Sequence, residues 1–206
     1  MTKAIEELSD VQLDVLKEIG NIGAGNAVTA LSKIINKRVI MNVPKVQIVE
    51  FKCLPDLLGG ADNLVVGILL SIKGDLKGHI LFIFEQQYSC LLLNLLMGKN
   101  IEDVSALTEI DISALKEIGN ILAGSYLSAL SSLTGLKVLP SVPDMTIDMA
   151  GAILSFPAIE FGKIGNSVLF IETEIVENHS TILGNFFLIP DVESYDTLLK
   201  ALGVES

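Results

Sequence analysis

The heptapeptide Leu16-Lys17-Glu18-Ile19-Gly20-Asn21-Ile22 occurs twice in the chain, the second time as Leu115-Lys116-Glu117-Ile118-Gly119-Asn120-Ile121. The copies lie 99 residues apart, and the similarity continues at this offset, without a gap, to Val43-Pro44 and Val142-Pro143. Self-similarity at one fixed offset over such a length is typical of an internal repeat. The chain is therefore predicted to consist of two related halves.

Beyond the proline, the halves keep one pattern while their residues diverge. Asn63–Ile72 and Lys77–Phe84 predict a β-hairpin with its turn at Lys73-Gly74-Asp75. Asn166–Ile175 and Thr181–Ile189 predict the same hairpin in the second half, around Glu177-Asn178.

Each half is then predicted to end in a short amphipathic helix. Apolar residues recur there at spacings of three and four, and Gly98 and Gly203 follow at the position preferred for a C-cap. The two apolar stripes are Tyr88, Leu91, Leu92 and Leu95, and Tyr195, Leu198, Leu199 and Leu202.

Each half thus reads as helix, strand, hairpin and helix, at about residues 11–98 and 104–203. The connection Gly98–Val104 is too short for a flexible linker between separate domains. We therefore expect a single α/β domain, layered as α+β, over residues 1–206. In it, two repeats related by a pseudo-twofold axis share one sheet, and helices cover a face of that sheet.

The composition excludes several function classes. The chain has 206 residues, with 25 acidic and 14 basic side chains and a net charge of −11, which disfavours binding to nucleic acid or anionic lipid. The longest apolar runs, such as Asn63–Ile72, are about half of what a membrane-spanning helix needs. Acidic residues near the N-terminus argue against a signal peptide. We expect a cytoplasmic protein without membrane insertion.

The residues that commonly hold metal ions are scattered along the chain. Cys53 and Cys90 stand 37 residues apart, with no His at a ligand spacing. His79 and His179 are isolated both from each other and from any pair of Cys. We therefore predict free thiols and no metal site.

The repeated helix, predicted from about Val11 to Ile35, has two distinct faces. At about 100° per residue, a second face gathers a Glu carboxylate and an Asn amide side by side, next to a glycine, within an arc of about 60°. The residues expected to face the sheet are Leu13, Leu16, Gly20, Gly23, Ala27, Ala30 or Leu31, and Ile34. The polar face holds Asp14, Glu18, Asn21 and Gly25, and its counterpart holds Ser113, Glu117, Asn120 and Gly124.

A single E-x-x-N on a helix is usually no more than solvated surface. Asn and Gly, however, are poor residues for a helix interior, at a cost of about 1 kcal/mol for each Gly relative to Ala. This departure from local preference occurs twice at matching positions, as is expected of a functional site.

The spacing of the residues on the polar face also excludes several kinds of binding site and catalysis. The order G-x-x-G-x-G inside a helical period differs from the dinucleotide fingerprint, and no G-K-[ST] follows as in a phosphate-binding loop. No His is spaced to pair with Glu18, and the one other carboxylate on its face, Asp14, is replaced by Ser113 in the second half, so the two faces share no acid–base pair. An amide such as that of Asn21 is instead suited to orienting a water molecule for attack on an electrophile held elsewhere.

These residues resemble the doubled signature of the CheC family, phosphatases that act on the response regulator CheY. The signature is Asp14-x-x-x-Glu18-x-x-Asn21 with Pro44 23 residues beyond the Asn, and Ser113-x-x-x-Glu117-x-x-Asn120 with Pro143 at the same distance. The resemblance covers essentially the whole chain, and neither copy is degenerate.

The resemblance implies hydrolysis of the aspartyl phosphate of CheY. Asn21 or Asn120 would hold the attacking water, and Glu18 or Glu117 would pair with a Lys of the regulator. Asp14 and Ser113, which open the two motifs, are expected to contact the partner. The regulator would supply Mg²⁺, so the protein would need no cofactor of its own.

The resemblance implies a second partner, the receptor deamidase CheD. Ile147–Ile153 resembles the segment with which the family contacts CheD, and Asp148 occupies its acidic position. An ordinary surface role for Asp148 is the alternative.

Two other functions could use the same helical face. Flagellar motor switch proteins share this doubled fold as scaffolds, and a non-catalytic adaptor could bind CheY or CheD without hydrolysis. The first predicted helix begins at about Val11 and the chain stops at Ser206. We therefore expect neither the docking peptide nor the switch domain of the switch-associated phosphatases.

Overall fold

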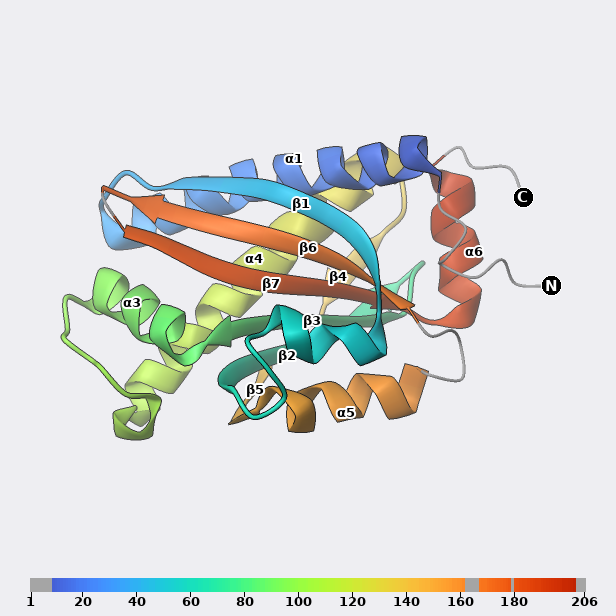
Figure 1. Cartoon of the computed structure of the whole chain (residues 1–206). Coiled ribbons are helices and arrows are strands. Elements are labelled where there is room, and N and C mark those ends of the chain that lie inside the picture. Colours follow the sequence, from blue (N-terminus) through green and yellow to red (C-terminus); the bar gives the residue numbers. More distant parts are fainter. Residues whose placement is uncertain (1–8, 162–166, 179, 203–206) are drawn as a thin grey trace.

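The computed structural model describes residues 9–161, 167–178 and 180–202, and both halves contribute a similar series of elements (Figure 1). The first half forms α1 (Asp10–Ile35), β1 (Ile40–Glu50), the 3₁₀ turn η2 (Phe51–Cys53), α2 (Leu54–Leu57), β2 (Leu64–Gly74), β3 (Gly78–Glu85) and α3 (Gln86–Met97). After the turn η3 (Val104–Ala106), the second half forms α4 (Glu109–Thr134), β4 (Val138–Pro140), β5 (Asp144–Met149), α5 (Ala150–Phe161), β6 (Ser167–Glu177), β7 (Ser180–Pro190) and α6 (Val192–Ala201).

The two halves exchange strands within one antiparallel sheet. In the described part of the chain, the sheet has seven strands in the order β1-β6-β7-β3-β2-β4, and β5 also pairs with β2. Strand β1 pairs with β6 of the other half, while β4 and β5 pair with β2. The hairpins meet at the centre, where β3 pairs with β7. Exchanging the halves leaves this order unchanged, which is the pseudo-twofold symmetry that the repeat predicts.

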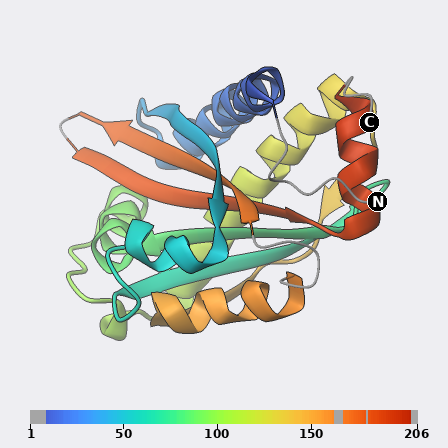
Figure 2. The ribbon, with the colours of Figure 1, turned by 45° about the vertical axis from the view of Figure 1, so that its right-hand side comes forward.

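Both faces of the sheet are buried. On one face, α1 and α4 pack in an apolar cluster with Ile80, Phe82 and Phe84 of β3. On the opposite face, α2 and α5 share a second cluster with Leu81 and Ile83 of the same strand. Successive side chains of a strand point to opposite faces, which explains the alternation. Figures 1 and 2 show the long helices on one side of the sheet and α5 on the other.

The prediction of helices over one face is therefore incomplete, because α2 and α5 were not predicted. Helix α2 has only four residues. Helix α5 is apolar around most of its circumference and contains Pro157, so it shows no clear amphipathic period.

Two residues of the predicted apolar stripes are exposed instead. Ile34 of α1 is 56% exposed and Leu91 of α3 is 41% exposed, so these two assignments were wrong. The predicted C-cap at Gly98 is confirmed by its left-handed φ of 63°. Asn166, Gly203 and the side chain of Tyr195 lie outside the described residues.

Helices α1 and α4 meet where a small residue of one faces a large residue of the other. A Cβ atom on Gly23 would lie 2.7 Å from Cδ1 of Tyr126, so only glycine fits there. The Tyr126 ring stacks on Phe186 with centroids 4.7 Å apart. In the repeat, Leu122 occupies the position of Gly23, and Ala27 that of Tyr126. The halves are therefore complementary here rather than identical.

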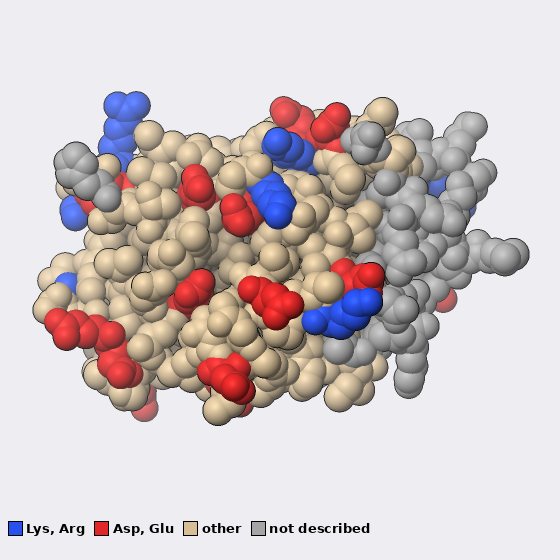
Figure 3. All heavy atoms as spheres, in the orientation of Figure 1, with Lys and Arg blue, Asp and Glu red and all other residues tan. Residues whose placement is uncertain are grey.

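None of the helices in the described ranges is long and apolar enough to cross a membrane. On the coloured part of the face in Figure 3, acidic side chains are scattered and the basic ones form no continuous patch. This surface lacks the clustered positive charge that nucleic acid requires.

Candidate active site

Each of the two long helices presents one polar face away from the core. The buried side chains of Leu16 and Ile19 on α1, and of Leu115 and Ile118 on α4, fix which side of each helix faces the sheet. The polar residues of the repeated motif are exposed, except for a half-buried Asn120; they are Asp14, Glu18, Asn21, Ser113, Glu117 and Asn120.

The Glu and Asn side chains on these faces are free to engage another molecule. Within the described ranges, the side chains of Glu18, Asn21, Glu117 and Asn120 make no hydrogen bond or ion pair. Ser113 differs, because its Oγ donates a hydrogen bond to the carbonyl oxygen of Glu109 at 2.8 Å. The two halves therefore offer the same uncommitted carboxylate and amide.

On α4 the polar face borders an open groove of about 450 Å³. One wall consists of Ser113, Lys116, Glu117 and Asn120, and the other is the connection between β4 and β5 at 140–143. Val142 in this connection is 88% exposed, so the rim of the groove is apolar. The structure thus brings Ser113, Glu117 and Asn120 together with Pro143, the distant proline of the motif.

The two prolines of the motif interrupt the first strand of each half at the same place. The pairing of β1 with β6 shifts register between Asn42 and Lys45, around Pro44. In the second half, β4 ends at Pro140 and β5 begins at Asp144. Proline has no N–H to donate to a ladder. The interruption frees the connection that forms the second wall of the groove on α4.

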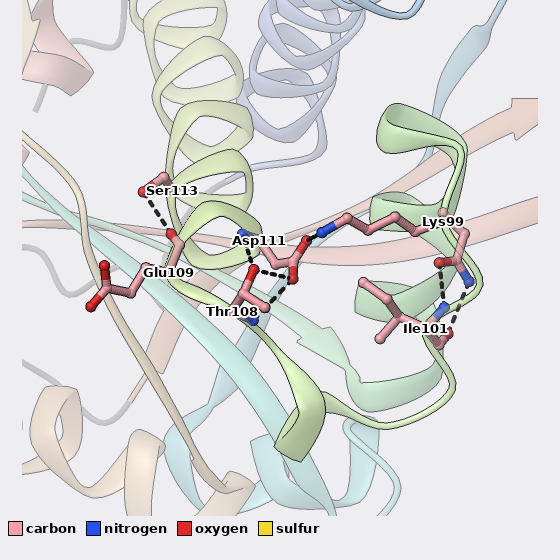
Figure 4. Close-up of polar contacts among 7 residues, drawn as sticks. Lys99, Ile101, Thr108, Glu109, Asp111 and Ser113 are labelled. Atoms are coloured by element: carbon pink, nitrogen blue, oxygen red, sulfur yellow. Dashed lines mark hydrogen bonds and ion pairs between the residues drawn. The ribbon is translucent and has the colours of Figure 1, made fainter.

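The start of α4 is fixed by a buried carboxylate (Figure 4). Asp111 is 1% exposed and accepts hydrogen bonds from the Thr108 backbone N–H at 2.9 Å and from Lys99 Nζ at 2.6 Å. The bond from Lys99 and those from Thr108 lower the pKa of Asp111 from 3.8 to about 2. This cluster ties the connection between the halves to the helix that carries Glu117 and Asn120.

An Asp111→Asn variant is expected to unfold at a lower urea concentration than the unsubstituted protein at pH 7. Because the native pKa is below the unfolded value, this stabilisation is complete above pH 3.8 and is lost as the pH falls towards 2. The difference in urea midpoint should therefore vanish across that interval. Glu109→Gln is the control, since it removes an exposed carboxylate from the same helical turn, and its urea midpoint should match that of the unsubstituted protein at both pH values. An Asp111→Asn midpoint difference that is equal at pH 7 and pH 2.5 would contradict the assignment.

Asp148 lies apart from this site, on the opposite face of the sheet. It is exposed in β5, where its Oδ1 accepts a hydrogen bond from the Met149 N–H at 2.8 Å. It lines a groove of about 360 Å³ between β5 and α5, together with Asp144 and the apolar side chains of Ile153 and Phe156. The groove therefore has acidic residues on the strand side and apolar residues on the helix side.

The sequence did not predict that Lys116, Ser141 and Val142 line the first groove, or Phe156 the second. The pair Val142-Pro143, which recurs as Val43-Pro44 in the first half, was the available signal for the first groove, although Val142 is exposed and Val43 is buried. Nothing in the sequence pattern indicated that Phe156 lines the second groove, because α5 was not predicted.

The residues that could bind a metal are dispersed in the structure too. Among the described residues, no three His, Cys, Asp or Glu side chains are placed to hold a metal ion together. Cys53 is exposed and Cys90 is buried, both as free thiols. His179 lies outside the described residues.

Comparison with known proteins places the repeat in a wider group. Residues 11–48 and 110–147 each match the CheC-like family, and these matches are 99 residues apart, the offset of the repeat. The chain is 38% identical over 200 residues to the CheY-P phosphatase CheC of Bacillus subtilis (strain 168), which covers 95% of this chain and 96% of that protein. A 28% identical match to the flagellar motor switch phosphatase FliY of Bacillus subtilis (strain 168) covers 68% of this chain and 36% of that protein.

Solved structures show the same fold at low sequence identity. FliY of Thermotoga maritima matches with a TM-score of 0.75 and 24% identity, covering 95% of this chain and 99% of that structure. The FliM middle domain of H. pylori matches with a TM-score of 0.68 and 14% identity, covering 94% of this chain and 99% of that structure.

Proposed function

The chain belongs to the CheC-like family, and we propose that it is a phosphatase that hydrolyses the aspartyl phosphate of the response regulator CheY. The observation that carries this proposal is the uncommitted Glu–Asn pair, which is presented on the outer faces of both α1 and α4. Two equivalent sites on one chain are suited to a macromolecular partner, because each lies on a helix surface rather than in an enclosed cavity.

In the proposed reaction, the amide of Asn21 or Asn120 positions a water molecule in line with the phosphorus atom. The water oxygen bonds to phosphorus while the bond to the aspartyl oxygen breaks, which releases inorganic phosphate and a free carboxylate on the regulator. Mg²⁺ held by the regulator would supply charge neutralisation at the phosphoryl group, and the share of this chain is the positioning of the water by its amide. A 10- to 100-fold acceleration requires only about 1.4–2.8 kcal/mol, which one well-placed amide can supply.

Adding the protein to phosphorylated CheY tests this proposal directly. We expect the acyl phosphate to decay about 10–100 times faster than CheY alone allows, as followed by release of inorganic phosphate. Binding to phosphorylated CheY with no faster decay would instead identify a non-catalytic adaptor or scaffold that uses the same faces.

Glu18 and Glu117 are proposed to dock the regulator by pairing with one of its lysines. Replacing both with Gln keeps the shape of each side chain and removes its charge. We expect Glu18→Gln, Glu117→Gln to bind phosphorylated CheY about tenfold more weakly at low salt, with a smaller loss at high salt, because the missing contact is a charge pair. Titration at two salt concentrations measures this, and equal affinity to the unsubstituted protein would reject the role.

Asp14 and Ser113 open the two polar faces and are proposed to contact the same partner. They differ in charge, and the Ser113 hydroxyl is bonded to its own helix. Any direct contact at this position therefore involves a carboxylate in one half and a hydroxyl in the other.

We also propose that the chain binds the deamidase CheD through the groove beside Asp148. Acidic residues along β5 and the apolar side chain of Phe156 suit a partner surface with basic and apolar residues. Because this groove lies on the other face of the sheet from α1 and α4, CheD and CheY would occupy separate surfaces. Comparison of CheD binding by the unsubstituted protein and by Asp148→Asn tests the contact.

A further inference from the structure

Gly25 and Gly124 occupy the same place on the two polar faces. Each lies four residues beyond a site Asn, which is about one helical turn along the axis and about 40° around it. Glycine is the least favourable residue in a helix interior after proline. Its presence at both positions therefore calls for a reason.

Neither the internal packing nor the backbone conformation of the protein requires glycine at these two positions. A Cβ atom built on Gly25 or on Gly124 would meet no heavy atom within 4 Å. Neither has a positive φ, so the backbone does not require glycine at either position. An alanine at each position would fit the described structure without contact.

Other glycines of the same helices show the contrast. A Cβ atom on Gly23 would lie 2.7 Å from Cδ1 of Tyr126, and one on Gly119 would lie 2.6 Å from Cγ2 of Ile68. These two glycines are needed for internal packing. Gly25 and Gly124 have no such contact, and both halves have glycine there, whereas two residues earlier Gly23 corresponds to Leu122.

The short reach of the site Asn explains why a helix surface without a side chain at the next turn would help docking. The Asn side chain is short, so Asn21 or Asn120 can enter another protein's phosphorylated pocket only if the helix backbone itself comes close. A Cβ atom one turn away on the same face would hold the two surfaces apart. Glycine is the residue that allows such close approach of main chain to a ligand.

We propose that Gly25 and Gly124 are positioning residues, against which the main chain of the phosphorylated regulator lies when the site Asn reaches its phosphoryl group. This inference rests on the proposed phosphatase function and extends the site from the side chains to the helix backbone. It assigns part of the docking specificity to the absence of a side chain.

A Gly25→Ala, Gly124→Ala double variant tests the proposal, because it separates docking from folding. Each alanine favours the helix, so the melting temperature should rise by about 4–8 °C in total. The KM for phosphorylated CheY should rise at least about tenfold, since a gain of one methyl group at a packed contact has a cost of this order. The control is Asn26→Ala, Ser125→Ala, whose positions lie about 100° around the helix from the glycines; its KM should stay unchanged.

Each outcome of this experiment is informative. A raised melting temperature with an unchanged KM would overturn the proposal, as would a lowered melting temperature, which would show an internal role for the glycines. If the unsubstituted protein itself does not accelerate decay, the proposed function fails instead. Direct titration of the variant with CheY carrying a beryllofluoride phosphoryl mimic would then still show whether the glycines affect docking.

Discussion

An Asn21→Ala, Asn120→Ala double variant should lose the whole acceleration of CheY dephosphorylation, a fall of about 10- to 100-fold to the regulator's own rate. The amide is the group on each polar face that can orient a water molecule, and alanine has no polar atom to replace it. Neither amide makes a hydrogen bond in the described structure, so its removal breaks no internal contact. Decay of the acyl phosphate at saturating protein measures the effect.

Stability and a matched substitution distinguish this loss from unfolding. Alanine is a better helix residue than Asn by about 0.5 kcal/mol, so the double variant should melt no lower than the unsubstituted protein. Asn26→Ala, an exposed Asn on the same helix but off the polar face, should keep full activity. Each single variant at Asn21 or Asn120 should retain activity from the other half. Full activity in the double variant would refute the catalytic assignment.

The parts of the structure that the sequence predicts well are those with a local and repeated signal. Helices α1, α3, α4 and α6 follow from an apolar period, and the internal repeat supports each of these assignments by its counterpart. The position of Glu18 and Asn21 on one exposed face follows from the helical angle alone. The spacing from Asn120 to Pro143 formed part of the family resemblance, and the structure places these two residues in the two walls of one groove.

The parts that the sequence misses depend on contacts between distant segments. The pattern of a strand indicates which residues form it, but not which strand lies beside it, so the pairing of β1 with β6 was not predicted. The continuous apolar run of Ile80–Phe84 is typical of a strand that is buried on both faces. The helices on the second face of the sheet were nevertheless not predicted, because α5 has no polar face and therefore no amphipathic period. The groove beside Asp148 was missed for the same reason.

The exchange of strands implies that neither half should fold alone. In the described structure β1 pairs with no strand of its own half, which leaves the isolated first half a single hairpin, β2 with β3. A two-stranded hairpin is at best marginally stable in water. Fragments 1–102 and 103–206, each prepared separately, should therefore lack a cooperative thermal transition by circular dichroism. A cooperative transition in either fragment alone would contradict this.

Mixing the two fragments should restore the fold as a one-to-one complex, which light scattering during gel filtration measures. The contact between Gly23 and Tyr126 determines this stoichiometry. In a dimer of two second halves, Tyr126 of one copy would face Leu122 of the other. The Leu122 side chain would clash with the ring, because the intact protein has Gly23 at that position. In a pair of first halves, Ala27 would face Gly23 and leave a cavity where the ring should be. Pairing of unlike halves therefore fills the helix contact, and either fragment paired with itself would overpack or underpack it.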